Sequence, residues 1–335
     1  MAPMAGACPP ALATAVGNAG GMGACGALLM QPEDIQSWVS AVRSSTNGTF
    51  QLNTWIPDPD PVRDTEHETS VRTYLNEWGP DVPAEAADAI QPDFIEQCNA
   101  MISASPRVMS SIMGLYPADV VVQMKDEGIH WFATATTVKE ALAAEAAGAD
   151  VIIAQGMEAG GHRGAFNADD AASKLIGLFS LLPAVVDAVS VPVVATGGIA
   201  DARHVAAAIT LGASAVQVGT GLLRSPEASI HKAWSNAIAT AQPEDTIATR
   251  AFSGRLGRSI RADYTEAFAR SDTPEPAPYP IQRNLTRAMR SDANNASDIN
   301  RMQSWAGQSS IYARNEPAAR IVTELWDDAL QLLPA

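Results

Sequence analysis

The chain has 335 residues, a formal net charge of −15 and 47% hydrophobic residues, which is enough apolar content for a large buried core. The acidic excess disfavours nucleic acid and anionic membrane surfaces as partners, because their phosphates would be repelled. The three cysteines, an odd number, fit no disulfide or zinc spacing, so we expect a cytoplasmic protein without a structural metal. No apolar run reaches the roughly 18 residues that a membrane span requires.

Short apolar runs alternate with Ala-rich segments of helical spacing along most of the chain. One such helix is expected at 137–147, where Thr136 or Thr137 can supply a cap and Gly148 ends the helix. Alternation of this kind predicts an α/β fold with a parallel sheet, and eight repeats favour a closed (β/α)8 TIM barrel over an open sheet. The expected strands are residues 2–4, 22–25, 50–55, 108–112, 129–134, 151–155, 191–196 and 215–219.

The expected barrel occupies residues 1–242, with an insertion near 57–107 that contains a Pro/Asp-rich loop and a helix at about 83–103. We expect this insertion to cross the catalytic face. Residues 243–304 are polar and interrupted by prolines, which predicts a small, mostly helical second domain or lid. The C-terminal part, 305–335, predicts an amphipathic helix that returns to the barrel.

The segment 155–164 follows a buried strand and carries Gly160, Gly161 and His162. TIM barrels place catalytic residues at the carboxyl ends of their strands, so His162 is the candidate catalytic residue. The alternative is a structural or surface histidine. Glu158 lies four residues before His162, but no second histidine completes a metal-binding pair, so we expect no metal there.

Two further glycine turns follow later strands of the expected barrel: Gly197 with Gly198, and Gly219 with Thr220. Backbone N–H groups beside a helix N-terminus bind phosphate without a lysine, and this is the usual barrel phosphate site. The alternative is that these glycines only form tight turns. An earlier match to G-x-G-x-x-G at 21–26 is set aside, because its glycines overlap a strand and no acidic residue ends the next strand.

Three amide side chains stand on the expected strands: Asn53 within one strand, and Gln155 and Gln217 at strand ends. An amide supplies both donors and acceptors, as the edge of a flavin requires. The alternative for each is a loop-capping role, and the residues alone leave both open.

In order along the chain, these pieces resemble the nitronate monooxygenase family, which consists of FMN-dependent TIM-barrel flavoenzymes. The resemblance covers nearly the whole chain and is most specific at 155–164. Its other pieces are residues 2–4, 18–23, Asn53, 196–199, 217–220, 253–255 and 305–309.

The resemblance implies that FMN is the cofactor and that His162 is the base near the flavin. Residues 3 and 4 would lie against the isoalloxazine ring, Asn53 and Gln155 would bond the flavin, and the glycine turns would hold its phosphate. The implied cofactor-binding set is Pro3, Met4, Asn53, Gln155, Gly160, Gly161, Gly197, Gly198, Gln217, Gly219 and Thr220.

Two departures from the family pattern bear on the site. The chain starts at the Ala2–Met4 motif, so its first strand is short. Many members also carry a second histidine after the fourth strand, where this chain has the stretch 110–114 with Ile112 and Met113. We therefore expect a more apolar substrate pocket.

The implied activity is oxidation of alkyl nitronates or nitroalkanes by dioxygen to carbonyl compounds and nitrite. The alternative enzyme is an FMN-dependent NAD(P)H reductase acting on an enoyl thioester or quinone. A third reading is a flavin-binding protein without turnover. The expected partners are a small substrate and dioxygen, with a homodimer possible.

Overall fold

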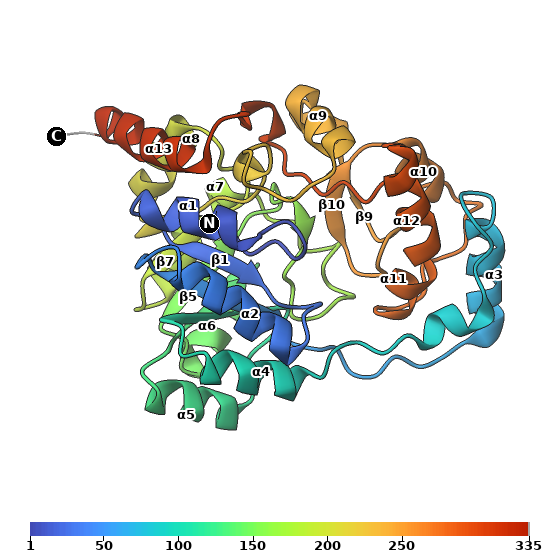
Figure 1. The fold of residues 1–335 in the computed structure, drawn as a ribbon, viewed down its shortest axis with the longest axis horizontal. Coiled ribbons are helices and arrows are strands. Elements are labelled where there is room, and N and C mark those ends of the chain that lie inside the picture. Colours follow the sequence, from blue (N-terminus) through green and yellow to red (C-terminus); the bar gives the residue numbers. More distant parts are fainter. Residues whose placement is uncertain (334–335) are drawn as a thin grey trace.

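The computed structural model describes residues 1–333. Its centre is a parallel sheet of seven strands in the order β1-β2-β3-β4-β5-β7-β8, with helices between the strands, a TIM-barrel-like arrangement (Figure 1). The strands are β1 (Gly23–Gly26), β2 (Phe50–Trp55), β3 (Val108–Ile112), β4 (His130–Ala135), β5 (Val151–Gln155), β7 (Val193–Thr196) and β8 (Ala215–Gln217). Seven of the eight expected strands are confirmed.

The expected strand at 2–4 is wrong, because this segment forms no regular strand. Its backbone nevertheless contacts both edges of the sheet: the amino group of Met1 donates to the Met22 carbonyl at 2.9 Å, and Ala2 N–H donates to the Val218 carbonyl at 2.8 Å. Pro3 has no N–H to continue such a ladder. Beyond it the chain turns, and Ala7 N–H donates to the carbonyl of Met4.

Helices cover the outer face of the sheet and their caps follow from the sequence. The Thr137 side chain accepts a hydrogen bond from Glu140 N–H, and Asp201 does the same for Arg203 N–H. The last helix, α13 (Ala318–Leu332), packs against α1 and α8 and adds Ile321 to the main core. The covering helices are α1 (Pro10–Asn18), α2 (Pro32–Arg43), α4 (Phe94–Ser103), α5 (Ala118–Asp126), α6 (Val138–Ala146), α7 (Leu178–Ala188) and α8 (Ala202–Thr210). Among residues 1–333, no helix is both long and apolar enough to span a bilayer.

A second hydrophobic cluster lies beside the sheet and unites two distant parts of the chain. Val71 and Leu75 of the insertion pack with Phe252, Tyr264 and Met289. We call the part of the molecule around this cluster the small unit. Its helices are α3 (Thr65–Leu75), η1 (Ala84–Asp88), α10 (Asp263–Phe268), α11 (Ile281–Leu285) and α12 (Arg287–Ala296).

The insertion does not contain the single helix expected at 83–103. It forms η1 and then α4, separated by a stretch that includes Pro92, whose ring and missing N–H interrupt a helix. Short elements complete the chain, namely η2 (Thr220–Leu222), α9 (Lys232–Thr240), η3 (Pro243–Asp245) and η4 (Ser310–Tyr312).

The prediction that residues 243–304 are mostly helical missed a three-stranded antiparallel sheet. Strand β10 (Gly257–Ile260) pairs with β9 (Thr246–Thr249) and with the two-residue β6 (Gly161–His162). The strands are only two to four residues long, too short for a period-two signal to stand out. This sheet joins the glycine turn after β5 to the small unit, so that His162 lies between the two parts of the molecule.

Candidate active site

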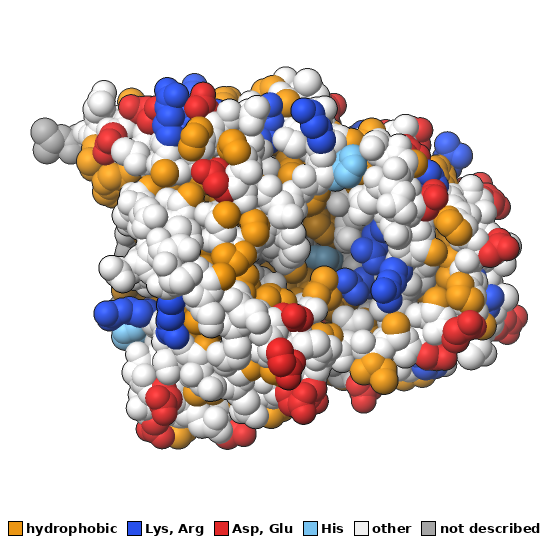
Figure 2. All heavy atoms as spheres, in the orientation of Figure 1, with side chains coloured by type: hydrophobic (Ala, Val, Ile, Leu, Met, Phe, Trp, Pro, Cys, Tyr) orange, Lys and Arg blue, Asp and Glu red, His pale blue; other side chains and the backbone are white. Residues whose placement is uncertain are grey.

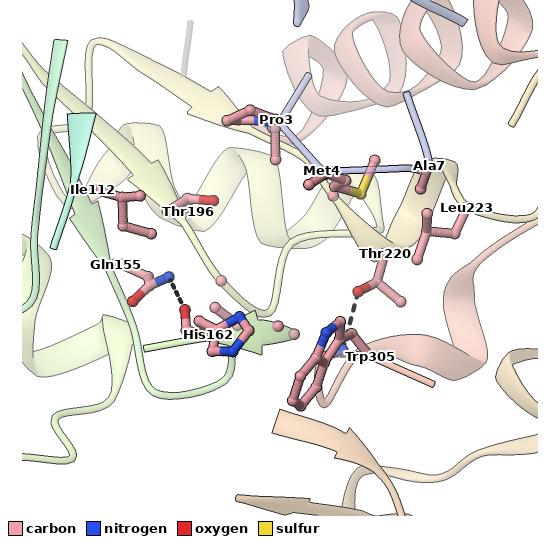
Figure 3. A pocket seen from close by; sticks show the side chains of 18 of the residues that line it. Pro3, Met4, Ala7, Ile112, Gln155, His162, Thr196, Thr220, Leu223 and Trp305 are labelled. Atoms are coloured by element: carbon pink, nitrogen blue, oxygen red, sulfur yellow. Dashed lines mark hydrogen bonds between the residues drawn. The ribbon is translucent and has the colours of Figure 1, made fainter. Parts of the chain in front are cut away.

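All twelve site residues expected from the sequence line one cavity at the carboxyl ends of the strands. In the close-up view, His162 and Trp305 lie along one side of the open space, and Pro3 and Met4 lie across from them (Figure 3). The members are Pro3, Met4, Asn53, Gln155, Gly160, Gly161, His162, Gly197, Gly198, Gln217, Gly219 and Thr220. These residues come together because parallel strands bring their carboxyl ends to one edge of the sheet. Their spacing along the chain did not by itself show that they would meet.

The sheet register places three polar side chains level with one another. Gln155 of β5 pairs with Thr196 of β7, which pairs in turn with Gln217 of β8. Thr196 Oγ1 donates to the Gln217 carbonyl at 2.9 Å, which ties the two later strands together at this level. One wall of the cavity is therefore polar and rigid.

The amides on this wall keep free hydrogen-bonding groups. Gln155 Nε2 donates to the His162 carbonyl at 3.0 Å, and its Oε1 accepts from Gly164 N–H at 2.8 Å, so this side chain also holds the turn that carries the histidine. One N–H of Gln155 remains. Asn53 Nδ2 donates to Ser110, and Gln217 Oε1 accepts from Gln51, which leaves Asn53 Oδ1 and Gln217 Nε2 without partners among residues 1–333.

The glycine turns after β7 and β8 form a cradle of backbone groups beside the cavity. Gly197 and Gly198 have φ of +103° and +71°, conformations that favour glycine. Within residues 1–333, the N–H groups of Gly198, Gly219 and Thr220 donate no hydrogen bond. A Cβ built on Gly219 meets only the side chains of Ala2 and Met4, at 3.4 Å and 3.6 Å, so no backbone atom crowds this position. Unpaired N–H groups beside an open cavity are the donors that a phosphate needs.

The segment 305–309 closes over this cradle. Gly307 N–H donates to Thr220 Oγ1 at 3.0 Å, and the Ser309 hydroxyl donates to the Gly198 carbonyl at 2.6 Å. A Cβ on Gly160 would lie 2.5 Å from the Gly307 nitrogen, so the two backbones touch. The turn after β5 and this segment therefore pack directly against each other beside the cavity.

His162 is enclosed by aromatic rings. Its ring centroid lies 4.6 Å from that of Trp55 and 4.8 Å from that of Trp305. Burial is the main cause that lowers the pKa of His162 to about 3, and the positive charges of Arg255, Arg283 and Arg290 contribute to this value. The imidazole is therefore neutral at physiological pH and available as a base.

Ser253 fixes how this imidazole is protonated. His162 Nε2 and Ser253 Oγ are 2.7 Å apart, and the serine hydroxyl also lies 3.2 Å from the Arg255 carbonyl, which accepts its hydrogen. The serine oxygen is then left to accept, which assigns the proton to Nε2 and the lone pair to Nδ1. Nδ1 has no hydrogen-bond partner within residues 1–333.

The sequence did not assign roles to Ser253, Trp55, Trp305 or Arg283, although all four contact or line the site. Three of them lie more than 80 residues beyond the turn that carries His162, in or next to the small unit. Ser253 and Trp305 belong to short motifs of the resemblance, and that was their only signal. Of the apolar pair Ile112 and Met113, only Ile112 lines the cavity.

Within the described 1–333, no group of three or more His, Cys, Asp or Glu side chains is arranged to hold a metal ion. The cavity instead combines the glycine cradle with its unpaired N–H groups, an amide wall and an aromatic enclosure around one neutral histidine. This combination at the carboxyl ends of a parallel sheet defines an α/β-barrel-like enzyme with a nucleotide-type cofactor pocket.

Comparison with known proteins identifies the family. A family model described as "Nitronate monooxygenase" matches residues 1–328, and the chain belongs to this family of flavin-dependent oxidoreductases. A nitronate monooxygenase of Paraburkholderia phytofirmans is 36% identical over 330 residues, covering 97% of this chain and 90% of the relative. A probable nitronate monooxygenase of Staphylococcus aureus is 34% identical over 335 residues, covering 98% and 93%.

Two solved structures are also similar to this chain. Nitroalkane oxidase from Streptomyces ansochromogenes superimposes with a TM-score of 0.90 at 33% identity, covering 100% of this chain and 96% of that chain. FabK from Thermotoga maritima superimposes with a TM-score of 0.75 at 26% identity, covering 99% and 93%.

Proposed function

We propose that this protein oxidises alkyl nitronates with dioxygen, and neutral nitroalkanes after removing their α-proton, to give a carbonyl compound and nitrite. The observation that carries the proposal is a neutral, aromatic-enclosed histidine in the same cavity as an open phosphate cradle. The family, and the likeness to a nitroalkane oxidase, support nitro compounds as the substrate class.

We propose FMN as the cofactor, because the residues present fit it. The unpaired N–H groups of Gly198, Gly219 and Thr220 would hold its phosphate, and the free amide groups of Asn53, Gln155 and Gln217 would meet the ring edge. The segment around Pro3 and Met4 would lie against the ring. Bound FMN would supply the redox chemistry, taking electrons from the substrate and passing them to dioxygen.

His162 would act as the base for neutral nitroalkanes. Its free Nδ1 takes the α-proton, and Ser253 holds Nε2–H so that the lone pair stays on Nδ1. The rings of Trp55 and Trp305 exclude water from one side of the imidazole. A preformed nitronate has already lost this proton and does not need the base.

We also propose that residues 243–304, together with α3 and η1 of the insertion, form a lid over a barrel made by the rest of 1–242 and the returning segment 305–335. The support is that the second hydrophobic cluster combines the insertion with this region, and that Ser253 and β10 contact His162. Closing this unit over substrate would complete the enclosure of the base.

The experiment compares His162→Asn with the unchanged protein, both reconstituted with FMN, by nitrite release from nitroethane and from ethylnitronate. Loss of the base should lower kcat/KM for nitroethane at least about 100-fold, the range of general-base catalysis. The change for ethylnitronate should be several-fold or less. Absence of nitrite from both substrates with the unchanged protein would refute the proposed activity.

The second candidate is an FMN-dependent NAD(P)H reductase, which the structural likeness to FabK favours. Anaerobic mixing with NADH or NADPH distinguishes the two activities. Rapid bleaching of the flavin absorbance, without nitrite formation from any nitronate, would support the reductase.

A further inference from the structure

Among residues 1–333, the only charged side chain that lines the cavity is that of Arg283 on α11, and none of their carboxylates lines it. This is unusual for a chain with a net charge of −15, whose surface is otherwise rich in acidic groups. Figure 2 shows Lys and Arg side chains gathered on the small-unit side of a hollow between the two parts of the molecule. The cavity is therefore locally positive in an acidic protein.

The guanidinium of Arg283 has no partner. Within residues 1–333 it makes no salt bridge and donates no hydrogen bond, although the side chain is half-buried and burial lowers its pKa. Its neighbours differ. Arg255 pairs with Asp58 through an Nε–Oδ2 contact of 2.6 Å, and Arg290 donates to Gln303 Oε1 at 3.0 Å. Desolvating an unpaired cation is costly, so a site of this kind is completed by an anion.

Arg283 lies near His162. Its charge is one of the causes that lower the pKa of His162. Tyr279, four residues before it, lies with its ring centroid 5.2 Å from that of Trp55, and Trp55 contacts the histidine ring. The phosphate cradle belongs to other elements, the turns after β7 and β8. The geometry therefore places Arg283 on the His162 side of the cavity.

We propose that Arg283 binds the two oxygens of the substrate's nitro or nitronate group, which deepens and rests on the proposed function. When the α C–H bond breaks, the proton goes to His162 and the electron pair forms the C=N bond, so negative charge collects on the two oxygens. The flat O–N–O group has the shape of a carboxylate, and a guanidinium fork donates two parallel hydrogen bonds to such a group. Arg283 is then a catalytic residue that stabilises developing charge, while it also binds preformed nitronates.

Nitrate is the probe, since it is a flat oxyanion that cannot be oxidised here. Nitrate binding to FMN-reconstituted protein is followed by tryptophan fluorescence at constant ionic strength, a readout that needs no turnover and that Trp55 and Trp305 should report. Arg283→Met should raise the Kd of nitrate at least tenfold, and Arg283→Lys, which keeps the charge without the fork, should raise it less. The Kd of FMN should stay within twofold.

Arg287→Gln is the matched control. Arg287 is exposed one turn further along and does not line the cavity, so this variant removes one nearby positive charge without a cavity contact. Its nitrate Kd should change less than twofold. An equal weakening in both variants would show a general field effect and overturn direct binding by Arg283.

Kinetics separate the remaining readings. Arg283→Met should lower kcat/KM by the same factor, at least tenfold, for ethylnitronate and for the nitronate of 3-nitropropionate. A loss confined to the second substrate would show that Arg283 binds a distant carboxylate, and a loss of FMN affinity would show that it binds the cofactor phosphate; either overturns the proposal. Nitrate binding that depends on Arg283, with no nitronate oxidised by the unchanged protein, would sink the proposed function while leaving the anion site intact.

Discussion

Replacing Ser253 with alanine isolates the positioning of the base from its chemistry. The Oγ of Ser253 lies 2.7 Å from His162 Nε2, and the serine side chain is fully buried, so water does not replace the lost acceptor without rearrangement. Removing one such hydrogen bond costs about 1 kcal/mol, with a typical range of about 0.5–1.5 kcal/mol. Since about 1.4 kcal/mol corresponds to a tenfold change in rate, kcat/KM for nitroethane should fall about three- to tenfold.

The assay measures nitrite release by Ser253→Ala from nitroethane and from ethylnitronate in parallel. The preformed nitronate needs no proton abstraction, so its kcat/KM should change less than about twofold. Ser253→Thr keeps a hydroxyl and should recover most of the lost rate. An equal loss on both substrates, or no recovery by threonine, would show that Ser253 matters for packing alone and would refute the tautomer argument.

The pH dependence of kcat/KM tests the proposed protonation state of His162. Protonation removes the lone pair of His162, and burial together with the nearby arginines lowers its pKa to about 3. The base is therefore deprotonated throughout the range above about pH 4. For nitroethane, kcat/KM should show no acidic limb near the ordinary histidine pKa of about 6.5. A limb at that value would mean that the imidazole is more hydrated than the structure indicates.

Three other predictions follow from the cavity and its surroundings. Gly219→Ala should weaken FMN binding at least about fivefold while leaving the melting temperature of the apoprotein nearly unchanged. Gly160→Ala should lower that melting temperature by several degrees, because its Cβ would lie 2.5 Å from a backbone nitrogen. Asp58→Asn leaves the guanidinium of Arg255 buried without its counter-charge and should cost about 3 kcal/mol in urea unfolding, against near-zero for Asp60→Asn on the same loop. The three cysteines, Cys8, Cys25 and Cys98, are buried, and burial raises the pKa of each thiol, to about 12 for Cys8 and Cys98. A thiol reagent at pH 8 should therefore label none of them until urea unfolds the chain.

The sheet and the glycine turns were predictable because their causes are local. An apolar run such as Val151–Gln155 predicts a buried strand wherever it occurs. The turn at Gly197 and Gly198 has positive φ, which glycine adopts at lower cost than other residues. The helix caps at Thr137 and Asp201 follow for the same reason, since each depends on groups within three residues. Sequence patterns that span only a few residues therefore identified seven strands and the cavity residues at their ends.

The rest of the site was not predictable because its causes are long-range. Ser253 reaches His162 across 91 residues, and Trp305 reaches it across a still longer stretch of chain. No periodicity records which of many serines or tryptophans will meet a histidine after folding. The two-residue strand β6 exists only because β10 lies beside it, and the insertion joins the small unit through a shared apolar cluster.

The placement of His162 on β6 couples the chemistry to the packing of the small unit. The ring is held at Nε2 by Ser253, and the His162 backbone pairs with Gly257 of β10, while the Gln155 side chain holds its carbonyl from the sheet. The base is therefore fixed only when the small unit is seated against the barrel-like sheet. Arg283 belongs to this same unit, so the anion contact proposed for it depends on the same packing. Both proposed roles, proton abstraction by His162 and anion binding by Arg283, therefore require the small unit to pack against the sheet. Substitutions in the second hydrophobic cluster, such as Leu75→Ala, should then reduce turnover of neutral nitroalkanes before they unfold the chain.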